Sequence, residues 1–92
     1  MTVLDILILS MGFSEDGKQV LGDVKFMIDN PGNVPRGLTL KCKCEASQRI
    51  RPDALLIGDA IRQLRRMPEI RSGEQRLKFA KGLKPLRADK AA

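Results

Sequence analysis

Histidine, tryptophan and tyrosine are absent from this chain of 92 residues, and its only aromatic side chains are three phenylalanines. Histidine is the commonest general base and a frequent metal ligand, so its absence argues against most acid–base and metal-dependent chemistry. The scarcity of aromatic side chains removes most of the surfaces on which single-stranded bases stack. We therefore expect a protein that is not an enzyme and that holds no cofactor.

Cysteine is scarce as well, and both cysteines, Cys42 and Cys44, lie in the stretch "LTLKCKCEA". Two cysteines are too few for a disulfide framework, and a closed zinc site needs four ligands, of which this pair supplies half. Apolar and polar residues alternate through the stretch, and both cysteines occupy apolar positions in register with Leu38 and Leu40. We expect an amphipathic strand in which reduced cysteine serves as a small apolar residue, without metal.

Long hydrophobic runs are missing too, because Asp5 interrupts the apolar N-terminal segment and no basic residue precedes it. The sequence therefore predicts neither a signal peptide nor a membrane span, and we expect a cytoplasmic protein. The length suits one domain, which we place over residues 1–83. A flexible basic tail is expected over residues 84–92.

A hairpin is the strongest local signal that the sequence does contain. The stretch "SEDGKQ" holds Asp16-Gly17, the dipeptide preferred by a two-residue type I′ turn, between two apolar runs. This turn would place Phe13 opposite Val20 and Leu7 opposite Phe26. One face of the two strands would then carry Leu7, Leu9, Met11, Phe13, Val20, Val24, Phe26 and Ile28.

A helix over Val3–Met11 is the competing interpretation, with Thr2 as its N-cap and Gly12 at its C-terminus. Strands are favoured because the hairpin register accounts for more residues. The segment Asp29–Gly37 is rich in proline, glycine and asparagine, which predicts a loop before the cysteine-containing strand.

The stretch "RPDALLIGDAIRQLRRMP" predicts a helix that begins at Pro52 and cannot continue through Pro68. Beyond it, Glu74–Lys81 is compatible with a helix or a strand, and the alternation in "RLKF" favours a strand. The expected fold is a small α+β domain. It has an antiparallel sheet of three to four strands, in the order βββα or βββαβ, and one amphipathic helix on the face bearing Phe26, Leu40 and Cys42.

Positive charge is concentrated in the second half of the chain. Residues 1–50 hold six basic and six acidic residues, whereas residues 51–92 hold eleven basic and five acidic ones, which accounts for the formal net charge of +6. Helical spacing places Arg62, Arg65 and Arg66 on one outer face. The neighbouring basic residues in the sequence are Arg51, Arg71, Arg76 and Lys78. This cluster predicts a binding module for an anionic partner, either nucleic acid or an acidic protein surface, against the alternative of a merely solvated face.

The rival prediction is a small assembly protein. In the predicted register Ile6, Ile8 and Met27 lie on the sheet face away from the helix, where an apolar patch would suit a homodimer. Folding of the loop or of the C-terminal segment over these three residues is the alternative.

Overall fold

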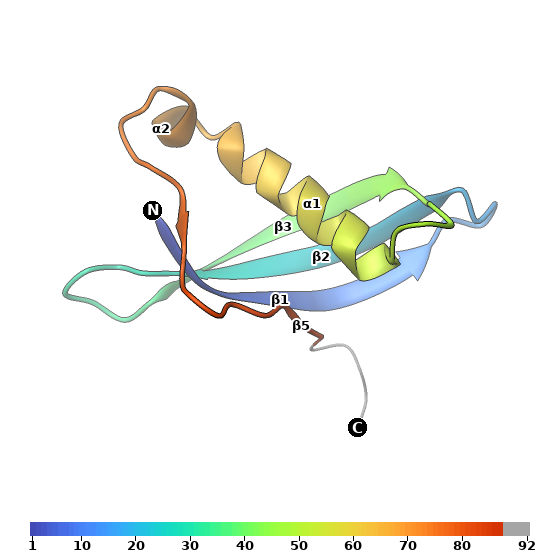
Figure 1. Ribbon diagram of the computed structural model, residues 1–92, viewed down its shortest axis with the longest axis horizontal. Helices are drawn as coiled ribbons and strands as arrows, with labels where there is room; N and C mark the ends of the chain where they lie inside the picture. Colours follow the sequence, from blue (N-terminus) through green and yellow to red (C-terminus); the bar gives the residue numbers. More distant parts are fainter. Residues whose placement is uncertain (88–92) are drawn as a thin grey trace.

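Three long strands, one main helix and three short elements make up the chain in the computed structural model, which describes residues 1–87 (Figure 1). The strands are β1 (Thr2–Phe13), β2 (Gln19–Ile28), β3 (Arg36–Glu45), β4 (Lys78–Phe79) and β5 (Leu86–Arg87), and the helices are α1 (Pro52–Arg65) and α2 (Pro68–Arg71). The sheet order is β3-β2-β1-β4, and β5 also pairs with β1. The predicted α+β class is thereby confirmed, with α1 lying across one face of the sheet (Figure 1).

The chain reverses at the predicted hairpin, but the turn differs from the type I′ turn expected. Within this turn only Gly17 has a positive φ (72°). The turn closes on Ser14, whose carbonyl accepts the amide of Gly17 at 2.9 Å. The Ser14 hydroxyl donates to Asp16 Oδ1 at 2.6 Å, and that oxygen also accepts the Lys18 amide. These hydrogen bonds lower the pKa of the Asp16 carboxyl. The loop is therefore longer than two residues and is held by a side-chain network.

The segment Val3–Met11 is a strand, as favoured, but two irregularities change which of its residues face the helix. The register of β1 on β2 follows the prediction from Phe13↔Val20 to Ser10↔Asp23, then shifts to Ile8↔Val24 and shifts again before Val3↔Ile28. Each shift inserts one extra residue in β1, and side chains beyond it change face.

The face prediction was therefore correct for β2 and wrong for much of β1. Val20, Val24, Phe26 and Ile28 are buried as predicted, whereas Val3, Ile6 and Ile8 replace Leu7 and Leu9 in the core. Leu9 is 36% exposed, and Phe13 is 56% exposed although it lies opposite Val20 as predicted.

The helix α1 begins at Pro52, whose missing amide proton costs nothing in the first turn, and it ends before Pro68. Its buried residues Leu56, Ala60 and Leu64 follow at intervals of four and pack against β2 and β3. Close approach to the sheet occurs at Gly22, where an added Cβ would lie 2.7 Å from Leu56 Cδ1. Gly58, inside α1, has only the Arg62 side chain nearby, so it is not a point of close approach to the sheet.

The C-terminal part runs along the second edge of β1 (Figure 1). A fourth strand does form, but β4 contains only two residues and pairs with β1 in parallel, with Thr2 opposite Lys78. β5 also pairs in parallel, with Leu7 opposite Leu86. The predicted tail over residues 84–92 therefore includes β5, and its last residues, 88–92, lie outside the described residues. No helix within residues 1–87 is both long and apolar enough to cross a bilayer.

Candidate anion-binding surface

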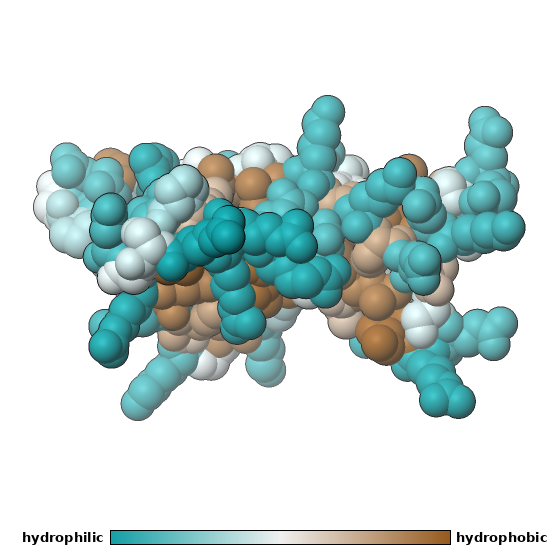
Figure 2. Space-filling model, turned by 90° about the horizontal axis from the view of Figure 1, so that it is seen from above, coloured by the Kyte–Doolittle hydropathy of each residue, from teal (hydrophilic) through white to brown (hydrophobic). Residues whose placement is uncertain are grey.

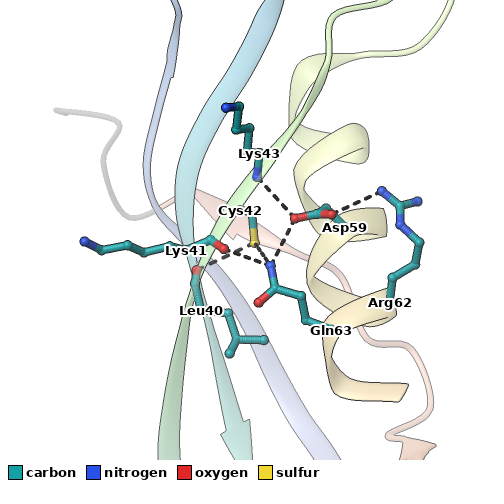
Figure 3. A network of polar contacts seen from close by, with 7 residues as sticks. All are labelled: Leu40, Lys41, Cys42, Lys43, Asp59, Arg62 and Gln63. Atoms are coloured by element: carbon teal, nitrogen blue, oxygen red, sulfur yellow. Dashed lines mark hydrogen bonds and ion pairs between the residues drawn. The ribbon is translucent and has the colours of Figure 1, made fainter. Parts of the chain in front are cut away.

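Polar side chains of α1 attach the helix to the free edge of β3 (Figure 3). Asp59 Oδ2 accepts the backbone amide of Lys43 at 3.1 Å, and Gln63 Nε2 donates to the carbonyl of Lys41 at 2.8 Å. Gln63 also donates to Asp59 at 3.0 Å, which fixes both side chains in one network. The helix thereby satisfies edge groups of β3 that a second strand would otherwise pair with.

Two of the seven predicted contact residues already have acidic partners. Arg62 donates to Asp59 Oδ1 at 3.3 Å, and Arg51 lies 3.4 Å from Asp53 Oδ2. Arg51 also stands before the first turn of α1, about 21 Å along a 14-residue helix from Arg66. The structure thus separates Arg51 from the other arginines of the helix.

Arg65 and Arg66 lie at the C-terminal end of α1, where both are exposed. Successive helical residues point about 100° apart, so Arg66 lies on the side of Asp59 and Gln63, whereas Arg65 lies toward Ile61. Within residues 1–87 neither arginine forms an ion pair. Arg65 lies in the last turn of α1, where its positive charge interacts favourably with the negative end of the helix dipole.

Arg66 and Arg71 border a shallow hollow where α1 gives way to α2. Pro68 and Ser72 complete its lining, and Pro68 is the first residue of α2. Arg71 is exposed and, like Arg66, forms no ion pair among the described residues. The junction of the two helices therefore places Arg66, Arg71 and Ser72 around one hollow.

Arg76 and Lys78, the last two predicted contact residues, are exposed in the segment that returns from α2 to β1. The backbone amide of Lys78 donates to the carbonyl of Met1 at 2.8 Å, which fixes this segment beside the start of β1. Figure 2 shows the side of the molecule on which α1 lies, with long hydrophilic side chains projecting over visible hydrophobic surface. All seven predicted residues are exposed, and five of them, Arg62, Arg65, Arg66, Arg71 and Arg76, follow the C-terminal half of α1 and the turn after it.

The two cysteines are free and lie on the helix side of β3. Burial raises the pKa of the Cys42 thiol to about 11, and the carboxylates of Asp59 and Asp23 act in the same direction. Burial also raises the pKa of Cys44, with Asp59 adding to the effect and Arg62 opposing it. Both thiols are therefore protonated at neutral pH, which suits apolar packing better than nucleophilic or redox chemistry. Within residues 1–87 no three potential metal-ligating side chains are placed to share an ion.

The residues predicted for self-association are divided between the two faces of the sheet. The placement of Ile6 and Ile8 away from the helix was wrong, because the register shift between Ile8 and Ser10 turns both into the core, where they are 4% and 1% exposed. Met27 does lie on the face away from α1, since it alternates with the buried Phe26 and Ile28. We call this face the outer sheet face; along β2 it carries Leu21, Asp23, Lys25 and Met27.

Comparison of the chain with protein-family models, with curated proteins and with solved structures finds no match. The class that the structure itself defines is a small α+β domain with a mixed sheet covered on one face by one main helix.

Proposed function

We propose that the chain is a non-catalytic binding module that holds an anionic partner, nucleic acid in the first place, at the junction of α1 and α2. The observation that carries the proposal is the hollow between Arg66 and Arg71, two exposed guanidinium groups without an acidic partner among residues 1–87. Arg62 and Arg51 are already paired with aspartates, so they contribute less.

Nucleic acid is the preferred partner because guanidinium groups bind phosphate oxygens bidentately, and phosphate contacts of this kind position proteins on nucleic acids. Arg65 precedes the residues that line the hollow and Arg76 follows them in the sequence; both are exposed and add to the positive surface. Contacts of this type give binding that depends steeply on salt and little on base sequence. The surface has no aromatic platform among these residues, so base stacking is not part of the proposal.

The test measures binding of labelled random-sequence DNA and RNA by fluorescence anisotropy across a salt titration. Replacing Arg66 and Arg71 by glutamine is expected to reduce the slope of log K against log salt concentration by about 1.4 to 1.8, since each lost phosphate contact removes about 0.7 to 0.9. The matched control replaces Lys18 and Arg36 by glutamine, because both are exposed and lie on the hairpin and at the start of β3.

Equal losses in the two double variants would contradict the assignment of the surface. Absence of binding at low salt would remove nucleic acid as the partner. Binding of polyglutamate under the same conditions, lost in the Arg66 and Arg71 variant alone, would then identify an acidic protein surface as the partner.

A further inference from the structure

The outer sheet face has no element of residues 1–87 packed over it, yet it carries large apolar side chains. Leu21 is 38% exposed and Leu9 is 36% exposed, and Leu7 and Met27 are partly exposed on the same side of the sheet. Ionisable residues separate these apolar groups, with Asp23 and Lys25 at the centre of β2. Neither of the two forms an ion pair within residues 1–87, although Asp23 Oδ2 accepts the Ser10 hydroxyl at 3.0 Å.

The order of these side chains along β2 is self-complementary. From Leu21 to Met27 the outer face reads apolar, acidic, basic, apolar, and its midpoint is Val24. Consider two copies whose outer sheet faces pack together about a two-fold axis at Val24, perpendicular to the strands. Each residue of β2 would then face the partner residue that lies equally far from Val24 on its other side. Asp23 would then meet Lys25 of the partner subunit, and Leu21 would meet Met27 of the partner subunit, twice each.

We propose that two copies of this chain form a homodimer by packing their outer sheet faces together about such a two-fold axis at Val24. The neighbouring strands agree with this arrangement. On β1, Leu7 pairs with Lys25 and Ser10 pairs with Asp23, so the axis places Leu7 over Ser10 and the adjacent Leu9 of the partner subunit.

The lysines of β3 are also accommodated. Lys41 pairs with Asp23 and Lys43 pairs with Leu21, while Thr39 and Gly37 pair with Lys25 and Met27. The axis therefore places Lys41 over Thr39 and Lys43 over Gly37 of the partner subunit, and no lysine faces another lysine. Asp5, which pairs with Met27, comes over Gly12 of the partner subunit, which pairs with Leu21.

The shape of the face supports the same partner. A shallow hollow lies beside Leu21 and is lined by Gly12, Ser10 and Lys43 among others. Gly12 has no side chain, so the hollow offers room beside Leu21, the residue that the axis places opposite Met27 of the partner subunit. Sheets that pack face to face bury such alternating apolar side chains about 10 Å apart. The α1–α2 junction stays free in this dimer because α1 covers the opposite face.

The test is a charge exchange on the full chain, followed by sedimentation equilibrium from about 1 μM to about 500 μM. The wild-type chain is expected to dimerise. Asp23→Lys brings four lysines together at the axis and Lys25→Asp brings four aspartates together, so each variant is expected to raise the dimer Kd at least about tenfold. Lys18→Asp makes the same charge change as Lys25→Asp, but in the exposed hairpin loop, and is expected to leave the Kd unchanged.

An equimolar mixture of the two single variants restores an opposite charge at every contact, so it is expected to form the mixed dimer with near wild-type affinity. The chain carrying both substitutions is expected to dimerise alone for the same reason. Recovery by mixing also excludes loss of folding as the cause, because an unfolded chain could not be recovered in this way. A wild-type monomer throughout the range, or a dimer unaffected by either single substitution, or a mixture that stays monomeric, would overturn the proposal.

Discussion

Asp59 in the middle of α1 accepts a hydrogen bond from the backbone amide of Lys43 at the free edge of β3, across an Oδ2···N distance of 3.1 Å. The same carboxylate accepts Gln63 and Arg62, so one side chain joins the helix, the strand edge and the basic surface (Figure 3). The Asp59 side chain is only 19% exposed, which makes the loss of these bonds more costly than at an open surface.

Asp59→Ala is expected to lower the free energy of unfolding by about 1 to 2 kcal/mol, because it leaves the Lys43 amide and the Gln63 side chain without this acceptor. Arg62→Ala removes only the ion pair with the exposed guanidinium group and is expected to cost less than about 0.5 kcal/mol. Urea unfolding followed by circular dichroism measures both. Equal costs would show that the ion pair, rather than the bond to the strand edge, gives Asp59 its role.

Gly22→Ala is expected to destabilise the fold by about 2 to 3 kcal/mol, since the new Cβ would overlap Leu56 Cδ1 and the carbonyl of Ser10. Leu56→Val removes the δ carbons of this side chain and therefore part of the overlap. In a double-mutant cycle the cost of Gly22→Ala should fall by about 1 kcal/mol in the Leu56→Val background. Additive costs would contradict direct contact between the two positions.

Gly58→Ala is expected to raise the free energy of unfolding by about 0.5 to 1 kcal/mol. The reason is that Gly58 lies inside α1 and its added Cβ would meet nothing nearer than Arg62 Nη1 at 3.9 Å. Gly17→Ala is the contrasting substitution, because a φ of 72° strains any residue with a Cβ, and it is expected to destabilise by about 1 kcal/mol. Thermal unfolding of the two variants should therefore shift in opposite directions.

The stability of the fold is expected to fall between about pH 9 and pH 11 through Cys42. Folding raises the pKa of this thiol from about 9.0 to about 11, so below pH 9 the thiol is protonated in both states and its contribution is fully present. Above pH 9 the unfolded chain loses the proton first, which favours unfolding until the folded thiol also ionises near pH 11.

Urea unfolding at intervals from pH 8 to pH 11 tests this with Cys42→Ala as the comparison. The variant keeps the other titrating groups, so its stability should decline less over this range than that of the wild-type chain. Parallel declines would mean that Cys42 ionises equally in both states.

The main helix and the three long strands could be predicted from local patterns. Pro52 and Pro68 delimit a helix by backbone chemistry alone, and the alternation around Cys42 and Cys44 is sufficient to predict a strand with one apolar face. The sequence could not predict which side chains of β1 lie on the helix side of the sheet. Leu7, Ile8 and Leu9 are all apolar, so no alternation of apolar and polar residues distinguishes them. Packing against α1 and β2 selects Ile8, and the inserted residues supply the change of face.

Some features of the candidate anion-binding surface could be predicted from the sequence, and others could not. Helical spacing was enough to predict that Arg62, Arg65 and Arg66 would be exposed, because an apolar stripe leaves the opposite side of a helix to water. The pairing of Arg62 with Asp59 is local to α1, whereas the hydrogen bonds of Asp59 and Gln63 to β3 depend on where the helix rests on the sheet. The charge order on β2 could be read directly from the sequence once its outer face was known, yet the exposure of that face required the tertiary structure.

By itself, therefore, the sequence determined the elements that depend on neighbours in the chain: the reversal at Gly17, the strand through the cysteines, and the helix from Pro52. The tertiary structure alone decided that Ile6 and Ile8 are buried, that β4 and β5 pair in parallel with β1, and that Asp59 and Gln63 bind the edge of β3. The physical reason is that backbone conformation and side-chain alternation are local, whereas burial and strand pairing depend on contacts between residues far apart in the chain.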